Sequence, residues 1–136
     1  MDTHPKQSNT RRCQFIQLLS NVDGYWVNVL GNKIFHDLNY YDLFTQMWLR
    51  VNTTANDSFR KSELYTLMPN ISQRTAVKYV QIAIDHGLLL EHTDSEDLRS
   101  KRITMSHDLK QKIEKFLDYS ISVFEALPSA SSKEKL

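Results

Sequence analysis

Glycine and proline are scarce in this sequence, with three of each among 136 residues. These two residues supply most tight turns, and a many-stranded sandwich or barrel needs such residues at most of its connections. The shortage therefore favours a mainly helical protein. A chain of this length has room for one domain with one hydrophobic core.

Cysteine is nearly absent as well, since Cys13 is the single one and cannot form an internal disulfide. A lone thiol is typical of proteins in a reducing cytoplasm. Cys13 follows two arginines, so an oxidant-sensing thiol remains an alternative. The interpretation as a small surface or interface residue is favoured, because no second cysteine is present to resolve an oxidised one.

Signals for metals, enzymes and membranes are also missing. The five histidines lack metal-site spacing, so no metal or cofactor is expected. No phosphate-binding loop or nucleophile motif occurs, which argues against an enzyme. The first ten residues lack the apolar core of a signal peptide, and no run approaches the ~18 apolar residues of a membrane span. We therefore expect a cytoplasmic protein with no membrane partner.

Charge of one sign is not in excess either. Seventeen basic and sixteen acidic residues give a net charge of +1. The net charge therefore does not indicate a nucleic-acid partner, and any case for one depends on where the charged residues lie.

Helical apolar patterns fill most of the chain. Apolar residues recur every three or four positions over 11–30, 40–51, 62–68, 72–86 and about 106–127. The long patterns at the two ends are rich in large residues that one small domain would struggle to cover, which indicates a partner helix. A glycine within the first pattern, Gly24, can bend or split that helix.

A β-ribbon is predicted between the last two helices. Residues 88–92 form a short apolar run, 93–98 are polar and acidic, and 99–105 can return as a second strand. We expect a loose arm at 1–10, a single domain at 11–127 and a disordered tail at 128–136.

The element order places a tight turn at Pro69-Asn70 between two helices, as in a helix-turn-helix. In that motif the second helix enters the major groove of DNA, and side chains near its N-terminus reach base edges. Arginine pairs with guanine and glutamine with adenine, whereas hydroxyls and the helix N-terminus suit phosphate. The candidate DNA-binding residues of this helix are Ser72, Gln73, Arg74, Thr75 and Lys78.

A second basic cluster follows the turn of the ribbon. Arg99, Lys101 and Arg102 can enter the flanking minor groove, whose negative potential attracts arginine. An alternative to DNA contact for Arg102 is an ion pair with a carboxylate inside the protein. Asp97 can hold the loop by an ion pair or a turn hydrogen bond.

From about 41 to 127 the chain resembles the MarR family of winged-helix regulators. Residues 72–88 follow the family's recognition helix without a gap, up to the Gly-Leu that opens the ribbon. Asp97-Leu98-Arg99 matches its Asp-x-Arg wing signature, and 103–106 stand where the family steps into its last helix. The resemblance places the DNA-binding part at about 41–106.

The resemblance implies a homodimer held by the N- and C-terminal helices, a pseudo-palindromic DNA operator and a transcriptional role often relieved by a small-molecule effector. Two features depart from the family pattern. The Pro69-Asn70 turn is one residue longer than usual, which can re-aim the reading helix. The C-terminal part is one helix where many relatives have two, which leaves the dimer geometry open.

We therefore predict a mainly α winged helix-turn-helix protein with a two-stranded wing and long dimerisation helices, binding double-stranded DNA as a regulator. The alternative is a winged-helix adaptor or assembly subunit without specific DNA binding, supported by the near-zero net charge. An enzyme using Cys13 as nucleophile is a remote third possibility. Aromatic residues, more often simple core, are the candidates for a ligand pocket: Tyr25, Trp26, Phe35, Tyr40, Tyr41 and Trp48.

Overall fold

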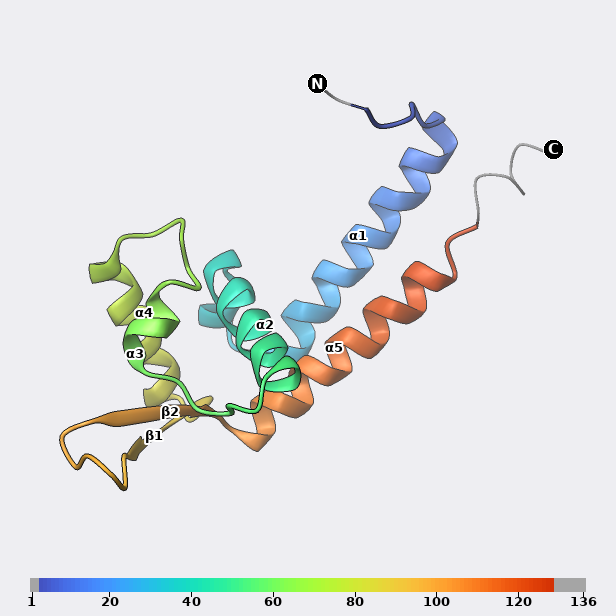
Figure 1. Ribbon diagram of the computed structural model, residues 1–136. Coiled ribbons are helices and arrows are strands. Elements are labelled where there is room, and N and C mark those ends of the chain that lie inside the picture. The colour runs from blue at the N-terminus through green and yellow to red at the C-terminus, as the bar shows by residue number, and fades with distance from the viewer. Residues whose placement is uncertain (1–2, 129–136) are drawn as a thin grey trace.

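The computed structural model describes residues 3–128 and is mainly helical (Figure 1). Helices α1 and α5 lie side by side as a two-helix arm, which projects from a unit containing the shorter helices and the ribbon. This arrangement confirms the predicted winged helix-turn-helix with a two-stranded wing and long terminal helices. The elements in chain order are α1 (Asn9–Leu30), η1 (Lys33–His36), α2 (Leu38–Thr53), α3 (Lys61–Tyr65), α4 (Gln73–Asp85), β1 (Leu89–Thr93), β2 (Lys101–Met105) and α5 (His107–Glu125).

Helix α1 is longer than the sequence indicated, and it is not split. Ser8 caps it by accepting a hydrogen bond from the backbone N–H of Arg11, so it begins two residues early. Gly24 lies within the continuous helix, and Gly31, with φ of 76°, ends it. Residues at every fourth position, which face α5, are buried: Leu18, Val22, Trp26 and Leu30.

A single 3-10 turn, η1, connects α1 to α2 and was not predicted. The side chain of Asn32 accepts a hydrogen bond from Ile34 N to start it, and Phe35 anchors it in the core. The indole Nε1 of Trp26 donates to the carbonyl oxygen of Phe35 at 3.2 Å. Four residues are too few to show a periodic pattern, which is why no sequence signal marked this corner.

The wing is an antiparallel ribbon in which Leu89 pairs with Met105 and Thr93 pairs with Lys101. Phe59 extends this sheet through a bridge to Ile103, with two backbone hydrogen bonds of 2.8 and 2.7 Å. Helix α2 continues to Thr53, two residues beyond the helical pattern expected over 40–51. The expected tail at 128–136 lies outside the described residues, apart from Pro128.

The hydrophobic core lies where α2, α4, α5 and the ribbon meet. Ser106 joins two of these parts, since its N–H donates to the carbonyl of Leu88 and its hydroxyl caps α5 at Leu109 N. No helix within residues 3–128 combines the length and apolarity needed to cross a membrane. The largest fully buried side chains are Tyr40, Phe35, Phe44, Leu43, Met47, Leu64, Met68, Leu89, Ile103, Leu109, Ile113 and Val80.

Candidate DNA-binding surface

Helix α4 is the candidate reading helix, and a side-chain cap begins its first turn. Ser72 is its N-cap, with the hydroxyl oxygen accepting from Thr75 N at 3.2 Å and donating to Thr75 Oγ1 at 3.1 Å. Ala76, Val80 and Ala83 are completely or almost completely buried. The small alanine side chains let α4 sit close to its neighbours, so the opposite face of the helix turns outward.

The outward face of α4 carries Gln73, Arg74 and Lys78, all exposed. Within residues 3–128, the side chains of Arg74 and Lys78 make no hydrogen bond or ion pair, so both cations are available to a ligand. Val77 lies between them and is 42% exposed. Val77 was not among the site residues expected from the sequence, although its methyl groups can contact the methyl group of thymine.

Two hydrogen bonds fix α4 against the start of α2, and a third caps α2 itself. The hydroxyl of Tyr79 donates to Asp37 Oδ2 at 2.6 Å, and the hydroxyl of Tyr40 donates to the carbonyl of Tyr79 at 2.7 Å. Asp37 uses its other oxygen to cap α2, accepting from Asn39 N at 2.6 Å. The Asp37 carboxylate therefore helps to set the orientation of α4, together with the bond from Tyr40.

Replacing Tyr79 with phenylalanine removes the bond to Asp37 and keeps the ring. We expect the free energy of unfolding to fall by about 1 kcal/mol. This loss is small for a hydrogen bond to a charged group, because Tyr79 is partly exposed to solvent. The hydrogen bond to Asp37 raises the pKa of Tyr79. The protonated hydroxyl is therefore favoured in the folded state. Its contribution to the free energy of unfolding is full below about pH 10 and is lost as the pH rises through the raised pKa.

Urea denaturation at neutral pH and at pH values above 10 measures this effect. The difference between the wild type and Tyr79→Phe should shrink as the pH rises. Tyr65→Phe serves as the matched control on α3, because no hydrogen bond of the Tyr65 hydroxyl is found within residues 3–128. A difference that stays constant to high pH would show that the Tyr79 hydroxyl does not carry the effect.

The turn of the wing presents Arg99 and Lys101 to solvent. Asp97 Oδ1 accepts from Arg99 N at 3.0 Å, and the carbonyl of Asp97 accepts from Ser100 N at 2.9 Å. This is the turn hydrogen bond that the sequence offered as one option for Asp97. Leu98 at the same turn is 78% exposed, so an apolar side chain accompanies the cations.

Arg102 is turned inward more than the other two basic residues of the wing. Its Nε donates to Ser58 Oγ at 3.1 Å and its Nη2 to the carbonyl of Ser58 at 3.0 Å. The internal partner is therefore a serine, where the sequence alternative was a carboxylate. Lys61 and Glu91 form an ion pair of 2.7 Å nearby, which lowers the pKa of Glu91. These contacts attach the wing to the start of α3, while a DNA contact by Arg102 stays a prediction.

A hollow of about 470 Å³ lies at the corner between α1 and α2. Of the aromatic residues proposed for a ligand pocket, Trp26 and Tyr41 line it. Phe35 and Tyr40 are core residues instead. The other lining residues are Asp23, Val27, His36 and Leu38.

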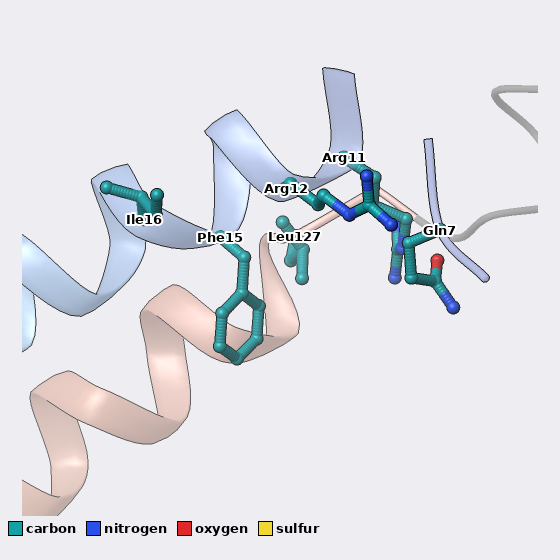
Figure 2. Close-up of a pocket in the computed structure, with 6 residues that line it drawn as sticks. All are labelled: Gln7, Arg11, Arg12, Phe15, Ile16 and Leu127. Atoms are coloured by element: carbon teal, nitrogen blue, oxygen red, sulfur yellow. The ribbon is translucent and has the colours of Figure 1, made fainter. Parts of the chain in front are cut away.

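A second hollow, of about 550 Å³, lies at the far end of the arm. Figure 2 shows Phe15 of α1 pointing towards α5, with Gln7, Arg11 and Arg12 gathered near the end of the helix pair. The ring of Phe15 lies 5.7 Å from that of Phe124. Cys13 is exposed on the same helix, outside the candidate DNA-binding surface.

Neither a protein-family sequence model nor a curated protein sequence matches the chain. Solved structures do match. The chain is similar to the transcriptional regulator Tm0710 from Thermotoga maritima, with a TM-score of 0.54 and 16% identity, over 93% of this chain and 87% of that one. It is also similar to a mutant of S. aureus MepR bound to an oligodeoxyribonucleotide, with a TM-score of 0.59 and 11% identity, covering 96% and 91%.

A third similar structure is NadR in complex with 4-hydroxyphenylacetate, with a TM-score of 0.55 and 12% identity over 99% of this chain and 89% of that one. At sequence identities this low, structural similarity shows a shared fold but not a shared activity. Of the three, Tm0710 is described as a transcriptional regulator, and the MepR mutant was solved with an oligodeoxyribonucleotide. The chain therefore shares the winged helix-turn-helix fold of these structures, which is the fold that its resemblance to the MarR family implied.

Proposed function

We propose that this protein is a transcriptional regulator that binds double-stranded DNA in a sequence-specific manner and has no enzymatic activity. The observation that carries the proposal is the outward face of α4, where Gln73, Arg74 and Lys78 are exposed and have no carboxylate partner within residues 3–128. The first acidic side chain along α4 is Asp85 at its far end, which is held by Gln81 at 2.9 Å. In this proposal the protein works in the cytoplasm.

In this proposal α4 occupies the major groove and the wing reaches the adjacent minor groove. The candidate contacts are Ser72, Gln73, Arg74, Thr75 and Lys78 on the helix, with Arg99, Lys101 and Arg102 on the wing. Ser72 and Thr75, bonded to each other at the helix start, suit a phosphate, because the N-terminus of α4 favours negative charge.

The protein acts as a homodimer in this proposal, joined through the arm. The arm presents large apolar side chains to solvent, including Ile16 at 64% and Ile121 at 55% exposure. A helix pair with so much exposed apolar surface is stabilised by a second copy packing on it. Two copies related by a two-fold axis would place two α4 helices on the half-sites of a pseudo-palindromic operator.

Selection of binding sites from a random duplex pool, followed by gel shift of the recovered sequence, tests the proposal. The expected result is an inverted repeat with half-sites about one helical turn apart. Recovery of no motif, with weak binding that depends only on salt, would reject it. That outcome would favour the second candidate, a winged-helix protein adaptor, for which the net charge of +1 is the supporting observation.

Arg99→Ala is expected to weaken binding to cognate and random duplexes by similar factors. Arg99 is exposed at the turn of the wing, where it meets the DNA backbone or the minor groove. Losing one phosphate contact should lower the slope of log affinity against log salt by about one. Glu96→Gln at the same turn removes a charge of opposite sign and should not weaken binding. An unchanged salt slope in Arg99→Ala would remove this arginine from the interface.

A small-molecule effector completes the proposed function. NadR, which shares the fold, was solved with 4-hydroxyphenylacetate. The hollow at the α1–α2 corner is the candidate effector site here, because its volume of about 470 Å³ falls in the range of small-molecule sites. Its lining residues His36 and Leu38 flank Asp37, the carboxylate that holds Tyr79 of α4.

A further inference from the structure

The corner pocket, lined by Asp23, Trp26, Val27, His36, Leu38 and Tyr41, has an aromatic wall. The rings of Trp26 and Tyr41 are 5.1 Å apart at an interplanar angle of 70°. Trp26 is held in place, because its Nε1 donates to the carbonyl of Phe35. A rigid indole beside a phenol offers π-electron density to a positively charged group.

The charges around this pocket are negative. Asp23 lines it, and no lysine or arginine is found among its lining residues within the described chain. Burial raises the pKa of the Tyr41 hydroxyl, and the nearby carboxylates of Asp23 and Asp42 raise it further. His36 is the remaining titratable lining residue, and no hydrogen-bond partner of its buried Nε2 is found within residues 3–128.

We propose that the corner pocket binds a small organic cation, an amine that carries an apolar or aromatic group. The ammonium group lies between the carboxylate of Asp23 and the aromatic wall, and the apolar group contacts Val27 and Leu38. An aromatic carboxylate of the same size is repelled by Asp23 and finds no lysine or arginine among the lining residues of the described chain. This inference names the effector class of the regulator proposed above.

The position of the pocket gives the ligand a route to the DNA-binding surface. His36 and Leu38 line the pocket on either side of Asp37. Asp37 caps α2 and accepts the hydroxyl of Tyr79 on α4. A ligand that moves the backbone at this corner therefore acts on a residue that helps to set the orientation of α4.

Three probes of nearly equal size separate charge from shape: benzylamine, which is cationic at pH 7, neutral benzyl alcohol and anionic benzoate. The full chain carrying Trp48→Phe leaves Trp26 as its single tryptophan, so its fluorescence reports on the pocket. We expect saturable quenching by benzylamine, binding of benzyl alcohol about tenfold weaker, and no saturation by benzoate.

Asp23→Asn should weaken benzylamine about tenfold and leave benzyl alcohol unchanged, because the exposed Asp23 contributes charge and not packing. Asp57→Asn is the matched control, since Asp57 follows the opposite end of α2 from the pocket. Circular dichroism confirms that each variant is folded.

Equal or tighter binding of benzoate, or an Asp23→Asn variant that binds benzylamine as well as the parent, would overturn the proposal. The titration is performed without DNA, and the operator selection is performed without any probe. A chain that binds the cation and no DNA would therefore reject the proposed function and keep the cation site, and the reverse result would reject the site alone.

Discussion

Arg74→Ala is expected to weaken binding to the selected operator by about 1–3 kcal/mol, which is a loss of roughly 5- to 150-fold in affinity. Arg74 lies in the first turn of α4, on its exposed face and without an internal partner within residues 3–128. A guanidinium in this position can pair with the O6 and N7 atoms of one guanine, and alanine removes both hydrogen bonds. The variant should also tolerate any base at the affected position of each half-site.

The comparison that isolates this role uses Lys78→Ala on the same face of α4. Lysine is suited to phosphate as a point charge, so its removal should weaken cognate and random duplexes by similar factors. Gel-shift titrations of both variants on the operator, on an operator with the guanine replaced and on random DNA give the required affinities. If Arg74→Ala loses the same factor on all three duplexes, Arg74 contacts only the phosphate backbone.

The parts of this structure that the sequence predicted best depend on interactions between residues close together in the chain. The helical apolar pattern over 72–86 predicted α4, and the candidate contacts Gln73, Arg74 and Lys78 lie on its exposed face. The turn at Asp97 is equally local, since its side chain bonds a backbone N–H two residues away. Both features reach their final geometry through contacts within one helical turn or one loop.

The features that the sequence did not predict join residues far apart in the chain. Tyr79 reaches back 42 positions to Asp37, and Arg102 reaches 44 positions to Ser58. Neither pair has a spacing that a periodic pattern can reveal, because its geometry exists only once α2, α4 and the wing have packed. The bridge from Phe59 to Ile103 belongs to the same class.

These long-range contacts have a common effect on the candidate site. The bond to Asp37 helps to set the position of α4, and the bonds from Arg102 to Ser58 help to set the position of the wing. The two parts that would contact DNA are thus attached separately to α2 and to the segment between α2 and α3. The sequence could therefore supply candidate contact residues, whereas their relative placement required the folded chain.

Ile121→Glu is expected to convert the protein into a monomer and to lower operator affinity by about 10²–10⁴-fold, because two linked half-site contacts become one. Ile121 is 55% exposed on α5, so the substitution leaves the core of one chain intact. A carboxylate placed in an apolar interface would lose its hydrating water without gaining a hydrogen-bond or ion-pair partner. Leu49→Glu on α2 is the control, since Leu49 has similar exposure but lies outside the arm.

Sedimentation equilibrium of the wild type and both variants measures the dimer directly, and gel shift on operators with one or two half-sites measures its consequence. The wild type should prefer two half-sites strongly, and Ile121→Glu should bind both operators with the same weak affinity. A dimeric Ile121→Glu protein would place the interface elsewhere than on this face of α5. If instead the variant is monomeric and still prefers two half-sites, the preference arises on DNA, and the arm does not set the spacing of the reading helices.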